Sequence, residues 1–94
     1  MTTATWHGKE IAKSDSTQEV DGYIYFPRDS VRMDLLQETP KTANDLKCPH
    51  GVQFYDVVDG AKASKRAAWS YEAPQARMKP VDHWIGFWED IQIR

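Results

Sequence analysis

Short apolar stretches alternate with turn residues along most of the chain, and this pattern predicts a mainly β protein. Asp21-Gly22 and Asp59-Gly60 each stand between two apolar stretches. Asp-Gly in that position favours a type I′ hairpin turn, because glycine adopts positive φ without strain. The predicted strands pair as 4–6 with 10–14 around His7-Gly8, 18–20 with 23–26, 52–58 with 61–71, and 84–88 with 91–93 joined at Glu89-Asp90.

The stretch between Pro27 and Pro40 has a different period. Its apolar residues recur at helical spacing, a polar residue can cap the start, and Pro40 ends the pattern. The apolar positions are Val31, Leu35 and Leu36, and the possible caps are Asp29 and Ser30. We expect one short helix here, a polar loop over 41–46 and one helical turn over 75–78. The expected fold class is mainly β with one or two short helices, irregular and strongly twisted.

Two of the predicted strands differ in which faces are apolar. Residues 67–71 alternate, with Ala67, Trp69 and Tyr71 on one side. Residues 84–88 are apolar on both faces, which indicates a central strand or one whose second face meets a partner. An exposed Trp84–Trp88 pair would favour a homodimer through this strand.

Length, charge and cysteine content narrow the class of protein. Ninety-four residues predict a single domain over 1–94, and four Trp, four Tyr and three Phe supply much of its core. The net charge is −2 with both signs interleaved, so no nucleic-acid partner is expected. One cysteine excludes an internal disulfide and fits a reducing compartment. No apolar run of about 18 residues and no signal-peptide pattern occur, so we expect a cytoplasmic protein without a membrane contact.

The single cysteine lies one proline away from a histidine, in Cys48-Pro49-His50. A thiolate nucleophile would need a nearby base, and a zinc site would need about four ligands. The other histidines, His7 and His83, are far away in the sequence. The pattern favours a proline-shaped turn that leads into the strand 52–58, and no metal site is expected.

Aromatic residues on two predicted neighbouring strands are the best candidates for a ligand site. Tyr55, Trp69 and Tyr71 could form a wall that stacks a planar ligand, or they could be the core itself. Arg28 is the cation most suited to an anionic ligand, although the pattern favours a solvated arginine at the start of a helix. The candidate pocket residues are Arg28, Cys48, His50, Tyr55, Trp69 and Tyr71.

Several blocks of residues, taken in order, resemble a known bacterial family. The blocks are Trp6-x-Gly8, Ile11-Ala12-x-Ser14, Gly22-x-x-Tyr25-Phe26-Pro27, Cys48-Pro49, Gly51, Tyr55, Ala67-Ala68-Trp69-Ser70-Tyr71-x-x-Pro74 and Phe87. This order resembles domain of unknown function 427, also labelled nucleotidyltransferase of unknown function, over about residues 6–93. The resemblance implies a small Mss4-like, or β-tent, fold. Family members commonly read Cys-Pro-x-Lys-Gly, whereas Cys48-Pro49-His50-Gly51 is one residue shorter and lacks the lysine.

The transferase label can be compared with the residues present. Nucleotidyl transfer usually needs two or three carboxylates that hold Mg²⁺, and neither a Gly-Ser turn followed by Asp-x-Asp nor a P-loop occurs. Asp56 and Asp59 straddle a predicted strand end, so they would not point to one site. We therefore expect a domain that binds a small planar or anionic ligand. A protein-interaction module is the alternative, a transferase comes third, and no cofactor is indicated.

Overall fold

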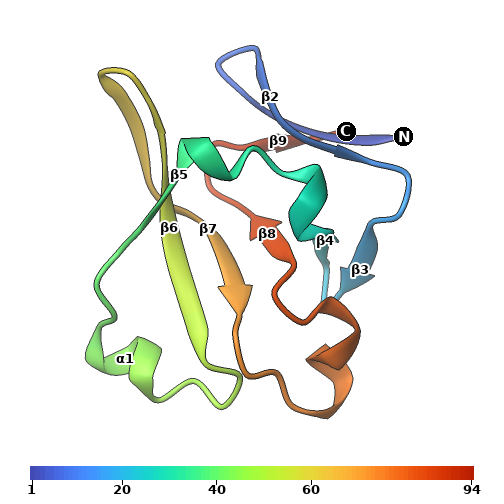
Figure 1. Ribbon diagram of the computed structural model, residues 1–94, viewed down its shortest axis with the longest axis vertical. Helices are drawn as coiled ribbons and strands as arrows, with labels where there is room; N and C mark the ends of the chain where they lie inside the picture. The colour runs from blue at the N-terminus through green and yellow to red at the C-terminus, as the bar shows by residue number, and fades with distance from the viewer.

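The computed structural model describes all 94 residues and has nine strands in two antiparallel sheets (Figure 1). The sheet orders are β2-β1-β9 and β3-β4-β8-β7-β6-β5. The strands are β1 (Thr2–Trp6), β2 (Lys9–Ser14), β3 (Gln18–Val20), β4 (Tyr23–Phe26), β5 (Leu36–Glu38), β6 (Val52–Asp59), β7 (Lys62–Tyr71), β8 (Ile85–Phe87) and β9 (Gln92–Ile93). The helical segments are α1 (Ala43–Leu46) and the 3₁₀ turns η1 (Arg28–Ser30), η2 (Met33–Leu35) and η3 (Ala76–Val81). The prediction of a mainly β fold with short helices is confirmed, while the Mss4-like assignment stays a prediction.

Three pairs of consecutive strands form hairpins, namely β1–β2, β3–β4 and β6–β7, and the residues of each turn determine its geometry. Asp21 and Gly22 have φ values of 54° and 86°, so the predicted type I′ turn is confirmed there. The third hairpin differs by one residue, because Asp59 pairs with Lys62 and the loop consists of Gly60 and Ala61. Gly60 has φ 63° at the first loop position, which is the type II′ arrangement.

The prediction of a helix between Pro27 and Pro40 is wrong. The chain makes the turns η1 and η2 and then enters β5, which pairs with β6. Val31 bridges to Ala12, and the Arg32 amide donates to the Ile11 carbonyl at 2.7 Å. These backbone groups therefore bond to a distant strand, and the tertiary pairing overrides the helical spacing of the side chains.

A short helix forms instead where a polar loop was expected. Thr42 caps α1, and its side chain accepts from the Asp45 amide while the Asp45 carboxylate accepts from the Thr42 amide. This reciprocal capping satisfies amides that a helix start leaves free. The helical turn expected over 75–78 forms as η3, which is longer and includes Pro80.

The last two strands do not pair with each other, so the expected hairpin at Glu89-Asp90 is wrong. β8 lies between β4 and β7 in the larger sheet, whereas β9 pairs with β1 in the smaller one. All three residues of β8 are buried, which confirms the alternative that this strand is central. The chain thus passes from one sheet to the other over residues 88–91.

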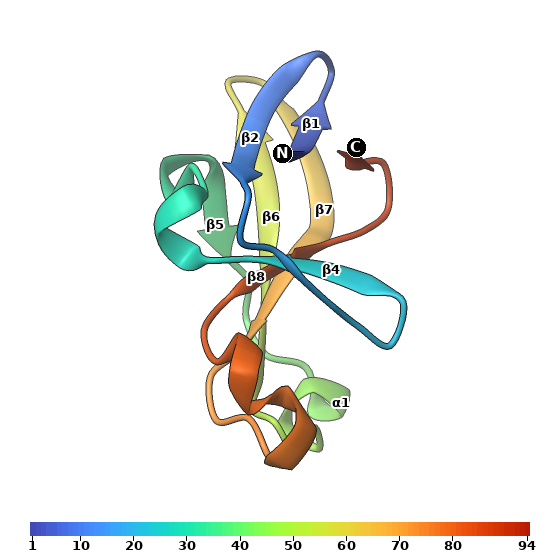
Figure 2. The same ribbon diagram turned by 90° about the vertical axis from the view of Figure 1, so that its right-hand side faces the viewer.

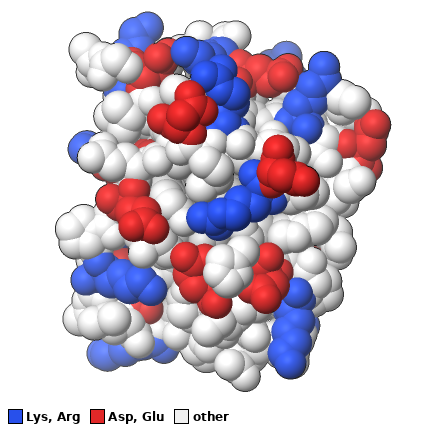
Figure 3. Space-filling view, in the orientation of Figure 1, with Lys and Arg blue, Asp and Glu red and all other residues white.

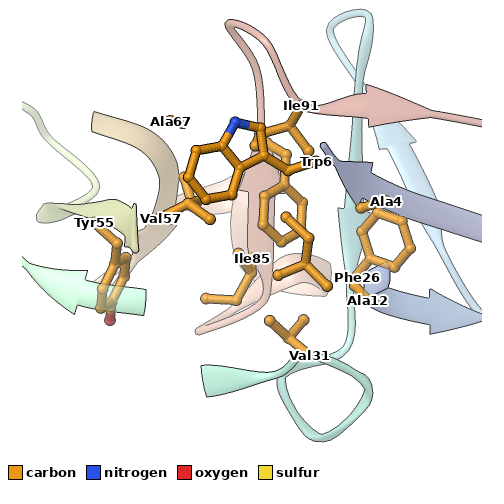
Figure 4. Packing of buried hydrophobic residues seen from close by; sticks show 13 residues of the cluster. Ala4, Trp6, Ala12, Phe26, Val31, Tyr55, Val57, Ala67, Ile85 and Ile91 are labelled. Atoms are coloured by element: carbon orange, nitrogen blue, oxygen red, sulfur yellow. The ribbon is translucent and has the colours of Figure 1, made fainter. Parts of the chain in front are cut away.

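The main core fills the space between the two sheets (Figure 4). Trp6 of the smaller sheet packs among side chains of the larger one, and Figure 4 shows its ring near Val57 and Ile91. The cluster comprises Ala4, Trp6, Ile11, Ala12, Phe26, Val31, Tyr55, Val57, Ala67, Ala68, Ile85, Phe87 and Ile91.

A second cluster lies on the other face of the larger sheet. It comprises Tyr25, Val52, Trp69, Met78 and Val81, so η3 covers part of this face. Trp69 and Tyr71 share this face as expected, but Ala67 belongs to the main core together with Ala68, which corrects its expected place beside Trp69. Figure 2 shows η3 and α1 at one end of the molecule and β1 and β2 at the other.

Charged residues of both signs are interspersed over the surface seen in Figure 3. No helix has the length and apolar character needed to cross a membrane.

Asp90 joins the two sheets through hydrogen bonds to one residue of each. Its carboxylate accepts hydrogen bonds from the Trp6 indole at 3.0 Å and from the Ser64 hydroxyl. The hydrogen bond from Ser64 lowers the pKa of Asp90. Asp90→Ala leaves both donors without this acceptor, and we expect it to reduce the free energy of unfolding by about 1–3 kcal/mol. Urea unfolding measures this, and Asp29→Ala, at an exposed carboxylate, is the control. Equal stability of the two variants would contradict the role of Asp90.

Candidate functional site

A concave site lies on the face of the larger sheet that carries the second cluster. It has a volume of about 200 Å³, and no charged side chain lines it. We call it the aromatic pocket, and its lining residues are Tyr23, Cys48, Val52, Phe54, Trp69, Tyr71 and Trp88. They come from β4, β6 and β7 and from the segments next to α1 and β8.

Trp69 is the innermost ring of the aromatic pocket. It pairs with Gly86 of β8, and a Cβ atom at Gly86 would lie 2.7 Å from the indole ring. Edge-to-face contacts hold Trp69 against Tyr23 at 5.1 Å and Trp88 at 5.2 Å between ring centroids. Its ring is buried, and a further edge-to-face contact joins it to Tyr25 at 5.8 Å between ring centroids.

Phe54 and Trp88 form the outer wall. Their rings stack with centroids 6.0 Å apart and planes inclined by 25°. Tyr23 and Trp88 remain 41% and 36% exposed, so the rings at the mouth of the pocket face solvent. A ligand could therefore reach the inner rings without opening the core.

Arg66 supports this outer wall from outside the pocket. Its guanidinium carbon lies 4.0 Å from the centroid of the Phe54 ring, and its nitrogens donate to both oxygens of Asp45 at 2.8 and 3.1 Å. These hydrogen bonds lower the pKa of Asp45 to about 2. The carbonyl of Arg66 accepts from the Trp88 indole at 2.6 Å.

The segment Cys48-Pro49-His50-Gly51 is a turn whose first residue lines the pocket. The Gly51 amide donates to the Cys48 carbonyl at 3.2 Å, and Gly51 has φ 64°. His50 stands outside the pocket, where its ring packs on Tyr71 at 5.1 Å and its Nδ1 accepts from the Gln75 amide. The turn therefore places the thiol in the pocket and the imidazole behind Tyr71.

Arg28 and Tyr55 lie elsewhere. Tyr55 belongs to the main core, and its hydroxyl accepts from the Arg28 guanidinium at 2.9 Å. Arg28 also donates to the His83 carbonyl at 2.9 Å. Figure 4 shows the Tyr55 hydroxyl directed away from the other core side chains. Of the six sequence candidates, the structure brings Cys48, Trp69 and Tyr71 together in the pocket, with His50 behind them.

The sequence analysis missed four lining residues: Tyr23, Val52, Phe54 and Trp88. The signal for Phe54 was strand register, since Phe54 pairs with Trp69 and side chains of directly paired residues share a face. Tyr55 then necessarily points to the opposite face. The signal for Trp88 was its two-residue spacing from Gly86, the residue that pairs with Trp69.

A second, polar concavity lies at the other sheet. It is lined by Thr5, Trp6, His7, Gly8, Asp90 and Gln92 and has a volume of about 240 Å³. Both carboxylate oxygens of Asp90 already accept hydrogen bonds from Trp6 and Ser64. No group of three or more His, Cys, Asp or Glu side chains is placed to hold a metal ion.

Gly86→Ala tests the close packing of Trp69. The added methyl group would overlap the indole ring, which is enclosed by other rings, so we expect a loss of about 1–3 kcal/mol in the free energy of unfolding. The near-ultraviolet circular dichroism of the tryptophans should change as well. Trp69→Phe removes the overlapping ring, so the double variant should lose less than the sum of the single changes. Strict additivity would show that Gly86 and Trp69 do not constrain each other.

The Asp45–Arg66 pair predicts a pH dependence of stability. Folding lowers the pKa of Asp45 from 3.8 to about 2. The pair therefore contributes its full stabilisation above pH 3.8, and this contribution is lost as pH falls through about 2. Asp45→Asn should remove part of the acid dependence seen in urea unfolding, while Asp90 retains another part. An unchanged acid dependence in Asp45→Asn, relative to Asp29→Asn as control, would contradict this assignment.

Comparison with known proteins places the whole chain in one family. A family model described as "Domain of unknown function (DUF427)" matches residues 2–93. A search of curated proteins gave no match. The matched range includes every residue that lines the aromatic pocket. The resemblance predicted from the sequence blocks is thus confirmed, and the chain belongs to the DUF427 family.

Proposed function

We propose that the protein binds a small planar molecule in the aromatic pocket. The observation that carries the proposal is the convergence of five aromatic side chains on one open cavity that no charged side chain lines. Aromatic rings contact other planar rings through offset or edge-to-face packing, which contributes about 0.5–1.5 kcal/mol per pair beyond area burial. Such a surface suits recognition of a ring more than recognition of a flexible chain.

The size of the cavity limits the ligand. Its volume is about 200 Å³. An apolar cavity of about 150 Å³ holds benzene, whereas pockets for drug-sized molecules span about 300–1,000 Å³. We infer that one or two fused rings enter the pocket and that any larger part of the ligand stays outside.

The charge of the lining favours a planar ligand over a strongly anionic one. Arg28 engages Tyr55 and His83, away from the pocket, and the polar groups of the lining are the Cys48 thiol and the hydroxyls of Tyr23 and Tyr71. An anionic group on the ligand would have to pair with a cationic side chain outside the mouth of the pocket, because no charged side chain lines it. The pocket therefore suits an uncharged planar ligand better than an anionic one.

Binding without catalysis fits the lining better than transfer chemistry. A nucleophilic Cys48 would need a base within hydrogen-bond reach. His50, the nearest in sequence, points behind Tyr71 and accepts from the Gln75 amide through Nδ1. A transferase remains the third alternative. We also keep the expectation of a bacterial source, which the family resemblance implies, and that of a cytoplasmic location, which the single thiol suggests.

A second candidate function is association with a partner or a second copy. Tyr23 and Trp88 are exposed aromatic residues at the mouth of the pocket, and such residues are enriched in interfaces. The homodimer expected through Trp84–Trp88 would use Trp88 alone, because β8 is central and Trp84 packs against the second cluster. This reading predicts a melting temperature that rises with protein concentration.

Binding can be tested with indole as a two-ring probe, followed by chemical shifts of the tryptophan indole N–H groups. We expect Trp69 and Trp88 to shift and Trp6, which lies between the sheets, to stay unchanged. Trp88→Ala and Tyr23→Ala should each weaken binding about tenfold or more, because each removes one ring contact and buried area.

Ile24→Ala is the matched control, because Ile24 is next to Tyr23 but packs against the main core on the other face. It should lower stability and leave indole affinity unchanged. Equal loss of affinity in Ile24→Ala and Tyr23→Ala would count against the pocket. Absence of any indole effect together with concentration-dependent melting would favour the interaction function.

A further inference from the structure

Arg66 lies at the point where the pairing of β6 and β7 is interrupted. On either side of it Tyr55 pairs with Ala68 and Val57 pairs with Ser64, so three residues of β7 stand opposite Asp56 alone. This bulge gives Arg66 a φ of 51°, a value that residues with a side chain rarely adopt. The Arg66 amide donates to the Asp56 carboxylate at 2.9 Å, which satisfies a group that the bulge removes from the strand pairing.

The bulge directs the guanidinium of Arg66 toward α1. Two parallel hydrogen bonds join it to Asp45, whose side chain is only 5% exposed. Asp45 in turn caps α1 through Thr42, and its carbonyl accepts from the Cys48 amide at 3.1 Å. Arg66 is therefore linked to the turn that places the Cys48 thiol in the aromatic pocket.

The same residue contacts both rings of the outer wall. The guanidinium covers one face of Phe54 at 4.0 Å, and the Arg66 carbonyl accepts from the Trp88 indole at 2.6 Å. Phe54 and Trp88 then stack on each other. Three lining residues from three separate segments thus depend on one arginine that does not itself line the pocket.

We propose that Arg66 is the positioning residue of the aromatic pocket, holding Phe54, Trp88 and the Cys48 turn in the arrangement that accepts a ring. This inference rests on the proposed ligand binding for its functional meaning. Holding the walls before a ligand arrives reduces the ordering that binding would otherwise require. The planar guanidinium is needed, because a lysine ammonium can neither make the two parallel bonds to Asp45 nor stack flat on Phe54.

The first arm of the test needs no ligand. Hydrogen exchange of the indole N–H groups of Trp88 and Trp6 is compared in Arg66→Met and in Lys65→Met, whose side chain is adjacent and exposed. We expect exchange at Trp88 to accelerate about tenfold in Arg66→Met alone, with Trp6 unchanged. Acceleration of both groups by the same factor, or of neither, would overturn the positioning role.

The second arm measures affinity for indole. We expect Arg66→Met to bind about tenfold more weakly than the unchanged protein, Arg66→Lys to recover only part of the loss, and Lys65→Met to bind normally. Should Arg66→Met fail to fold, Asp45→Asn replaces it, since that change removes the charged partner and keeps the arginine.

The two arms separate the two claims. Equal indole affinity in Arg66→Met and the unchanged protein would overturn the positioning role and leave ligand binding intact. No binding of indole to the unchanged protein, with selective exchange at Trp88 in Arg66→Met, would contradict ligand binding in the pocket and support the structural part of the inference.

Discussion

The central strand β8 must be covered on both faces, and the rest of the architecture depends on that requirement. Ile85 and Phe87 point into the main core, so the smaller sheet has to close over them. Gly86 points to the other face and leaves a gap that the Trp69 ring fills. A chain of 94 residues has little apolar material for two cores, because small domains bury a smaller share of their surface. Large aromatic side chains and the short η3 segment complete the second one.

The aromatic pocket follows from this shortage. η3 covers Tyr25, Val52 and Trp69 at one end of the second face. Toward the other end the rings of Tyr23, Phe54 and Trp88 pack on one another and on Trp69, and those of Tyr23 and Trp88 are partly exposed to solvent. The concave surface is therefore a part of the core that remains uncovered.

Three of the four predicted hairpins form, around His7-Gly8, Asp21-Gly22 and Gly60, whereas the pairings between distant segments could not be predicted. Asp21-Gly22 fixes its turn locally, because both residues need positive φ. β5 forms because it pairs with β6, and the amide of Arg32 donates to an acceptor on β2. Both partners are distant in the sequence, so the local pattern of residues 27–40 predicted a helix that does not form. Thr42 and Asp45 have the spacing of the capping box that starts α1. The surrounding residues are so polar that the sequence predicted a loop there.

The candidate site was half predictable for a similar reason. The aromatic strand 67–71 indicated Trp69 and Tyr71 correctly as neighbours, but the partner strand offers Phe54 and Tyr55 side by side. A shift of one residue in register exchanges the two faces. The bulge at Arg66, which is held by contacts with Asp45 and Asp56, moves the pairing by two residues between Val57–Ser64 and Tyr55–Ala68.

Pairing of β1 with β9 also brings the two ends of the chain together. Thr3 and Arg94 exchange backbone hydrogen bonds at 2.8 and 2.9 Å, and both termini lie at the same edge in Figure 1. This edge belongs to the smaller sheet, which covers the face of the larger sheet opposite to the aromatic pocket. A host protein could carry this domain as an insertion in a surface loop, because the loop ends would need little separation. The pocket mouth would then face away from the host.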